Sequence, residues 1–214
     1  GVGGHGAYPH TTKDPVVVAA SIVMALQTLV SRNVDPQTPA VVTVGSFQAG
    51  AKHNIISDEA KLLLTVRSYD DATRTMLLEG IERIAKAQAA AFGAPEPSIS
   101  IDNDYTPATY NDPDLTAKAV SAISGVIGEE NVVSMTPVMG GEDFSQYGRT
   151  PEDVPGLIYW LGAVKADTWQ QAQAGDVSLP SLHSPFFAPD YELTIATGVK
   201  TMSAAAISLF NEGE

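Results

Sequence analysis

The chain has 214 residues, with 25 acidic and 12 basic side chains, a formal net charge of −13 and a hydrophobic fraction of 44%. A chain this apolar buries a core, which excludes wholesale disorder, and its negative charge argues against binding to a nucleic-acid backbone or an anionic membrane. The absence of cysteine excludes disulfides, a cysteine nucleophile and thiolate metal ligands within it. No apolar run approaches the roughly 20 residues of a membrane-spanning helix, and the start lacks the features of a signal peptide, so we expect a cytoplasmic protein.

The first half of the chain alternates helical and strand patterns. Each helix start carries an aspartate in the N-cap position, and the strand segments are rich in residues that favour β-structure. The predicted elements are a helix from Asp14-Pro15 to near Asn33, strands at Val41–Phe47 and Leu62–Tyr69, a helix from Asp70 or Asp71 to Gly93, and a strand at Ser98–Ile101. With a strand tail before Gly3, this order predicts a ferredoxin-like βαββαβ layer, part of an α/β protein, with both helices on one face of an antiparallel sheet.

The second half follows a linker at Tyr105–Pro113 that is rich in proline, asparagine, aspartate and threonine. The predicted elements here are a helix from Asp112-Pro113 to Gly125 or Gly128, short strands at Val132–Met135 and Leu157–Leu161, a brief helix at Glu142–Tyr147, and a final helix with one stripe formed by Ile195, Val199, Met202, Ala206 and Leu209. About twenty residues before Leu182 show no clear period. A parallel sheet of two strands is too small to stand alone, so we expect further strands from chain that precedes residue 1.

Histidine offers the clearest candidates for chemistry. His5 stands in the glycine-rich segment Gly3–His10, where glycines on both sides allow close backbone approach, and an imidazole held there can stabilise a developing oxyanion. The alternative is a plain turn that leads into the helix. None of the four histidines forms a local metal motif, and a structural or surface role remains open for each.

Five segments in order resemble a known metallopeptidase and amidohydrolase family that includes hippurate hydrolase, indole-acetyl-amino-acid amidohydrolase, carboxypeptidase G and aminoacylase. The segments are Gly3–His10, His53–Asp58, Thr65–Ser68, Met139–Phe144 and Leu182–Phe187. The match covers nearly all of this chain but only the second half of a family member, and it is closest to the hippurate hydrolase branch. The Glu142-Asp143-Phe144 and His183-Ser184-Pro185 sequences carry that preference. Ser57 departs from the proline that is usual in its loop.

The resemblance implies a two-domain enzyme in which a lid is inserted into an α/β catalytic domain and mediates homodimerisation. Residues 1–107 would be the lid, and residues 108–214 the returning part of the catalytic domain. The chain would then begin just inside the lid.

The resemblance also implies roles for individual residues. His5 would reach into the partner subunit's active site and stabilise the oxyanion, with Asn54 contacting substrate from the same side. Arg67 would pair with the substrate carboxylate, which suits a planar, bidentate guanidinium. The remaining candidates are Gly140, Gly141 and Glu142 in the substrate pocket and His183 as a metal ligand. For Arg67 the alternative is a surface ion pair, for Asn54 an ordinary turn residue, for His183 a helix-entry position, and for Glu142 a helix cap.

The implied reaction is hydrolysis of the amide bond of a small N-acyl amino acid by an enzyme with two divalent metal ions, zinc, manganese or cobalt. The general base and most metal ligands would lie in the family's first half. One histidine cannot hold a metal that needs four or more donors, so we expect this chain alone to lack activity and tight metal binding. The alternative is a non-catalytic dimerisation or binding module. Neither reading predicts a nucleic-acid or membrane partner.

Overall fold

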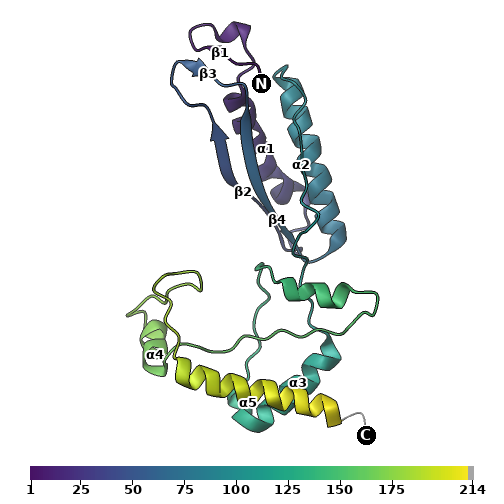
Figure 1. Cartoon of the computed structure of the whole chain (residues 1–214), viewed down its shortest axis with the longest axis vertical. Helices are drawn as coiled ribbons and strands as arrows, with labels where there is room; N and C mark the ends of the chain where they lie inside the picture. The colour runs from purple at the N-terminus through teal and green to yellow at the C-terminus, as the bar shows by residue number, and fades with distance from the viewer. Residues whose placement is uncertain (212–214) are drawn as a thin grey trace. The chain divides into compact units, whose positions relative to one another are not determined.

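The computed structural model describes residues 1–211, which divide into two compact units (Figure 1). The first unit comprises residues 1–109 and 138–145, and the second comprises residues 110–137 and 146–214, of which 212–214 lie outside the described residues. The chain therefore passes from the first unit to the second within the predicted linker. A short segment of the later sequence then returns to the first unit. The assignment of the two units to a lid and a catalytic domain stays a prediction.

The first unit is built on helix α1, which runs over Pro15–Asn33 as the sequence predicts. The Asp14 carboxylate accepts a hydrogen bond from the Val16 N–H at 2.9 Å, and proline occupies the first turn. Apolar residues three and four apart place Ile22, Leu26 and Leu29 on the buried side.

Two long strands form the sheet on which α1 packs. Strands β2 (Ala40–Ala49) and β4 (Ala60–Ser68) are antiparallel, with Val41 opposite Arg67 and a register irregularity between Val44 and Ser46. Alternate residues of β4, among them Leu64 and Val66, pack against the core formed with the helices. Arg67, one position further, therefore lies on the face of the sheet that the helices leave free.

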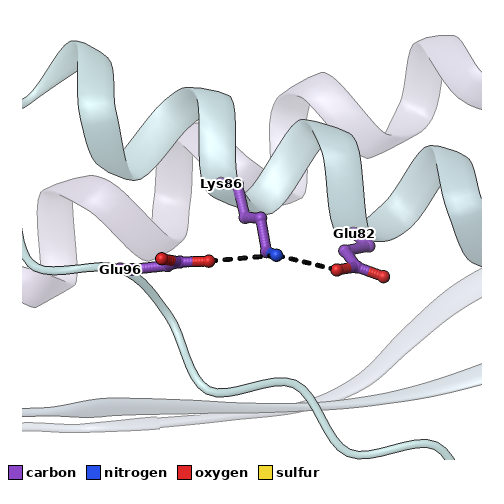
Figure 2. Close-up of polar contacts among 3 residues, drawn as sticks. All are labelled: Glu82, Lys86 and Glu96. Carbon is purple, nitrogen blue, oxygen red and sulfur yellow. Dashed lines mark ion pairs between the residues drawn. The ribbon is translucent and has the colours of Figure 1, made fainter.

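Helix α2 (Asp71–Ala91) completes this layer, and its N-cap Asp70 accepts hydrogen bonds from both the backbone N–H and the hydroxyl of Thr73 at 2.7 Å. Close to its end, Lys86 pairs with Glu82 at 2.8 Å and with Glu96 at 3.0 Å (Figure 2). The hydrogen bond to Glu82, followed by the one to Glu96, raises the pKa of Lys86 above its ordinary value. The ion pairs thus attach the segment after the helix to the helix surface.

A second small sheet lies beyond one end of the β2–β4 pair (Figure 1). It consists of β1 (Gly4–His5) and β3 (Ile55–Ile56) in antiparallel register, and the short 3₁₀ helix η1 (Pro9–Thr11) follows β1. The predicted strand at Ser98–Ile101 is wrong, because this segment forms no ladder within the described residues. Prolines at positions 95 and 97 lack backbone donors just before it. The helices therefore cover a two-stranded sheet instead of a four-stranded one.

The second unit is held together by two helices, α3 (Pro113–Ile127) and α5 (Tyr191–Phe210). Their common core contains Ala119, Ile123 and Ala205, and the Thr201 hydroxyl is buried within hydrogen-bond distance of Tyr159. The unit also contains the shorter helices η2 (Glu129–Asn131) and α4 (Ala166–Ala174), whereas η3 (Asp143–Arg149) begins in the first unit and ends in the second. Helix α4 was not predicted because it has no side-chain cap at its start and no buried residue, and its one local signal is Gly175, which ends it in the left-handed conformation.

The two strands predicted in this half, Val132–Met135 and Leu157–Leu161, are wrong as well. Leu157 packs on the α3–α5 core as a buried strand would. The backbone of Ile158, however, exchanges both hydrogen bonds with the Asn111 side chain, at 2.8 and 2.9 Å. A side chain therefore supplies the partner that a neighbouring strand would provide.

The apolar stripe expected on the final helix lies largely at the surface. Ile195, Val199 and Met202 are each about 60% exposed, with 62%, 62% and 60% of their surface accessible, and the buried contacts are made by Thr201 and Ala205. By length and composition alone, α1 and α5 are both apolar enough to cross a membrane, which corrects the expectation that no such run exists. Core helices of soluble proteins share this length and composition, and Leu26 and Leu29 of α1 are core residues of the first unit.

Candidate functional site

His5 and Asn54 lie side by side in the first unit. The β1–β3 pairing sets His5 opposite Ile55, and the Gly6 N–H donates to the Asn54 carbonyl at 2.8 Å. A Cβ on Gly6 would stand only 3.1 Å from that carbonyl, so the missing side chain allows the two segments to approach this closely. Segments about fifty residues apart in the sequence are thereby joined, with both named side chains exposed.

The imidazole of His5 has a defined hydrogen-bonding arrangement. The Ala7 N–H donates to Nδ1 at 3.0 Å, which makes this nitrogen an acceptor. In a neutral imidazole the other nitrogen, Nε2, then carries the proton and is a donor. The Tyr8 ring lies against the imidazole with a centroid separation of 5.6 Å. An exposed N–H donor held in this way is the group that a developing oxyanion requires.

Asp58 anchors the backbone of the segment that carries His5, a role that the sequence did not indicate. Its carboxylate accepts a hydrogen bond from the Gly3 N–H at 2.9 Å. A Cβ on Gly3 would lie 2.7 Å from both the Asp58 oxygen and the Ile56 carbonyl, so only glycine fits there. The signal available in the sequence was an aspartate closing the same loop that carries Asn54.

Arg67 and Gly141 form a second group. The segment 138–145 belongs to the first unit, and a Cβ built on Gly141 would collide with Nη1 of Arg67 and stand 3.2 Å from its Cζ. The guanidinium therefore lies directly against the glycine. No carboxylate among residues 1–211 forms an ion pair with Arg67, although its surface is only partly exposed. The surface ion pair considered for Arg67 is thus not formed within the described chain.

Gly140 and Glu142 flank Gly141 in the same exposed segment. The backbone carbonyl of Glu142 accepts hydrogen bonds from the N–H and the hydroxyl of Ser145, at 3.2 and 2.7 Å. This geometry shapes the turn into η3 and does not involve the Glu142 carboxylate. A role of that carboxylate toward substrate stays a prediction.

The two groups lie at opposite ends of the β2–β4 pair. Asn54 precedes the start of β4 at Ala60, whereas Arg67 lies near the end of this strand, which Figure 1 labels. Seven residues of strand correspond to about 23 Å at a rise of about 3.3 Å per residue. Within a single copy the structure does not bring His5 and Arg67 together.

His183 lies in the second unit, exposed, in the turn where the Ser184 N–H donates to the Ser181 carbonyl at 2.9 Å. Across residues 1–211 no group of three or more histidine, aspartate or glutamate side chains is arranged to hold a metal ion. The described residues therefore do not by themselves fit a metal centre. His183 as a ligand stays a prediction.

Comparison with known proteins identifies relatives of both halves of the chain. Residues 1–92 match the family described as a peptidase dimerisation domain of the M20 type. The Bacillus subtilis protein YhaA is 36% identical over 208 residues, which cover 97% of this chain and 49% of that protein. N-acetyldiaminopimelate deacetylase of Streptococcus suis is 33% identical over 197 residues, covering 90% of this chain and 47% of the deacetylase.

Among solved structures, Bacillus subtilis YXEP, described as a dinuclear metal binding peptidase from the M20 family, has a TM-score of 0.61 and 27% identity over 91% of this chain and 46% of that one. The chain thus belongs to a class of proteins that carry a peptidase dimerisation domain. In particular, residues 1–92 belong to the M20 dimerisation-domain family, and the similarity of most of the chain to M20 peptidases and amidohydrolases confirms the resemblance drawn from the five segments. It spans about half the length of the curated relatives it matches.

Proposed function

We propose that this chain supplies the lid and the C-terminal part of the catalytic domain of a metal-dependent amidohydrolase. Its substrate would be an N-acyl amino acid of the hippurate type, and its active form a homodimer joined through the first unit. The proposal is supported by relatives named as a deacetylase and as thermostable carboxypeptidases, since both names denote hydrolysis of an amide bond. The observation that carries it is the Nε2 donor of His5, fixed beside Asn54.

His5 and Asn54 provide donors for the oxyanion end of the substrate. Hydrolysis of an amide converts the carbonyl oxygen into an oxyanion as water adds to the carbon. The Nε2–H of His5 is oriented before the reaction, because the Ala7 N–H occupies Nδ1. Donors oriented in advance stabilise the charge without reorganising as it forms. The Asn54 amide contributes a further donor from the adjacent segment.

Arg67 would bind the other end of the substrate, the carboxylate of the amino acid. Its guanidinium is planar and always charged, and it presents paired N–H groups that match the two oxygens of a carboxylate. Because no carboxylate of the described residues neutralises it, the charge remains available to a ligand. The substrate would thus be held at its carboxylate by Arg67.

The separation of about 23 Å along β4 means that the two ends of one substrate cannot be served by His5 and Arg67 of the same copy. A second copy, related by a two-fold axis, can supply His5 and Asn54 to the Arg67 of the first, and the reverse. This is why we propose a site that is complete only in the dimer. The second unit would add His183 to the metal centre, whose other ligands would lie outside this chain.

A mixed-dimer experiment tests this proposal. His5→Ala and Arg67→Ala variants of the full-length enzyme are each purified, then mixed under conditions that exchange subunits, and hydrolysis of hippurate is measured. If His5 acts across the dimer, random pairing of two-fold dimers yields heterodimers with one intact site, and activity rises to about a quarter of the wild-type value.

The contrary outcomes are equally clear. Exchange verified by mass spectrometry without any recovered activity would show that both residues act within one subunit. Single variants that keep the wild-type activity would show that neither residue serves the reaction. A wild-type protein that dimerises but hydrolyses no N-acyl amino acid would favour a dimerisation module without chemistry.

A further inference from the structure

The space beside Arg67 depends on the absence of a side chain at Gly141. A Cβ on Gly141 would overlap Nη1 of Arg67, stand 3.2 Å from Cζ and stand 3.4 Å from Cγ2 of Thr106. The end of the guanidinium therefore occupies the volume that any other residue at position 141 would fill. Arg67 comes from the helix-free face of the sheet, and Gly141 from a segment more than seventy residues later that belongs to the same unit.

Neither the backbone conformation at position 141 nor the surroundings of the adjacent Gly140 account for the requirement for glycine at position 141. Among the described residues, glycines with positive φ are Gly50, Gly93, Gly128 and Gly175, so Gly141 is not in the left-handed region. A Cβ on the adjacent Gly140 would meet only Cγ2 of Val138, at an ordinary 3.9 Å. The steric requirement is thus specific to position 141 and has Arg67 as its cause.

We infer that Gly141 is a positioning residue for Arg67, and that it sets the selectivity of the enzyme for substrates with a free carboxylate. The inference rests on the proposed function of Arg67 as the carboxylate-binding residue. A long, flexible side chain loses conformational freedom when it binds a ligand, and the affinity improves when part of this freedom is already lost in the free protein. The glycine at position 141 leaves open the volume in which the guanidinium lies, so the guanidinium occupies this place before substrate arrives.

The substitution Gly141→Ala is expected to displace the guanidinium and to leave the backbone in place. The atom that would collide is the free end of a flexible side chain, which can move away at little cost. We expect the KM for hippurate to rise about tenfold, while kcat changes much less, because the carboxylate is held equally in the ground state and the transition state. The KM for the corresponding carboxamide, which lacks the charge, should stay within about twofold of the wild-type value.

Two measurements separate the positioning claim from the proposed function. The first is independent of activity: the ¹H–¹⁵N resonance of the Arg67 side chain, assigned by its loss in Arg67→Ala, should shift in Gly141→Ala and stay in place in the adjacent Gly140→Ala. The second is the hippurate-to-carboxamide KM ratio in the full-length enzyme for Gly141→Ala, Arg67→Ala and the double variant. Gly125→Ala, at an exposed helical position with open space around it, is the matched control and should keep the wild-type ratio.

If Gly141 acts through Arg67, the double variant has the same ratio as Arg67→Ala alone. An unchanged Arg67 resonance in Gly141→Ala, or a further loss of selectivity on adding it to Arg67→Ala, overturns the positioning role and leaves the proposed function intact. An Arg67→Ala enzyme with the wild-type ratio overturns both. Should Gly141→Ala fold poorly, the double variant, in which the collision is removed, must regain stability, and failure to do so also counts against the inference.

Discussion

The contact between α1 and α2 permits a quantitative test of the first unit. Gly80 of α2 faces Leu29 of α1, and a Cβ on Gly80 would lie 2.5 Å from Cδ1 and 3.2 Å from Cδ2 of this fully buried leucine. Replacing Gly80 with alanine therefore has two opposing effects on stability. Alanine is favoured over glycine within a helix by about 1 kcal/mol, whereas forcing a methyl group into a packed core costs about 1–3 kcal/mol.

The packing cost should prevail, so we expect Gly80→Ala to lower the free energy of unfolding by about 1 kcal/mol. Gly125→Ala provides the matched control, because a Cβ there meets no atom within 4 Å and only the helical preference applies. It should raise the stability of the second unit by up to about 1 kcal/mol. The opposite signs of the two glycine substitutions distinguish close packing from backbone preference.

Urea unfolding monitored by far-UV circular dichroism follows both units, while the emission of Trp160 and Trp169 reports on the second unit, to which both belong. Leu29→Ala alone should cost about 2–5 kcal/mol, and combining it with Gly80→Ala should cost less than the sum, because the new methyl group enters vacated space. If Gly80→Ala instead stabilises the chain as Gly125→Ala does, or if the two substitutions are additive, Leu29 does not pack on Gly80 as described.

Three further outcomes are expected. The hydrogen bonds from the backbone and hydroxyl of Thr73 lower the pKa of Asp70 below its ordinary value of 3.8, so their stabilising effect is complete above that pH and is lost as the pH falls through the lowered pKa. The difference in urea midpoint between wild type and Asp70→Ala should therefore be constant from pH 7 to about pH 5 and vanish in stronger acid. A difference that persists unchanged in acid would refute the role of Asp70 as a charged cap. His5→Ala in the full-length enzyme should lower kcat by about 10²–10³, the loss typical of one oxyanion donor, with metal content by atomic emission unchanged, and a loss of metal would instead indicate a ligand role. The 214-residue chain alone, dialysed after exposure to zinc, should retain no stoichiometric metal, whereas one equivalent per chain would contradict the ligand count.

The long helices α1, α2 and α3 were predictable from the sequence because their signals are local. Asp14, Asp70 and Asp112 each accept a backbone hydrogen bond at the start of a long helix, in the positions that the sequence indicated. The strands were less predictable, because a strand exists only when a partner lies beside it. The segments Val41–Phe47 and Leu62–Tyr69 pair with each other, whereas Ser98–Ile101 has the same alternation without a partner strand among the described residues.

In the candidate site, too, the local motifs could be predicted from the sequence and the contacts between distant residues could not. Motif order indicated His5, Asn54, Arg67 and Gly141 one by one. It could not indicate that Asp58 holds the Gly3 backbone, or that Gly141 leaves room for Arg67, because these relations join residues that are tens of positions apart. Pairings of this kind depend on the folded arrangement of the chain and leave no period or local composition by which a sequence alone could reveal them.

The β2–β4 pair connects the group formed by His5 and Asn54 with the group formed by Arg67 and Gly141. If His5 serves one active site and Arg67 another, the length of the strands fixes the distance between the two, and the α1–α2 layer determines how rigidly it is kept. Residues of the core, such as Leu29 and Gly80, then influence turnover without touching substrate, since a lid that packs loosely presents the His5 donor over a wider range of positions. Because catalysis by a preoriented donor depends on sub-ångström placement, the stability of this layer and the rate of the reaction should change together in core variants.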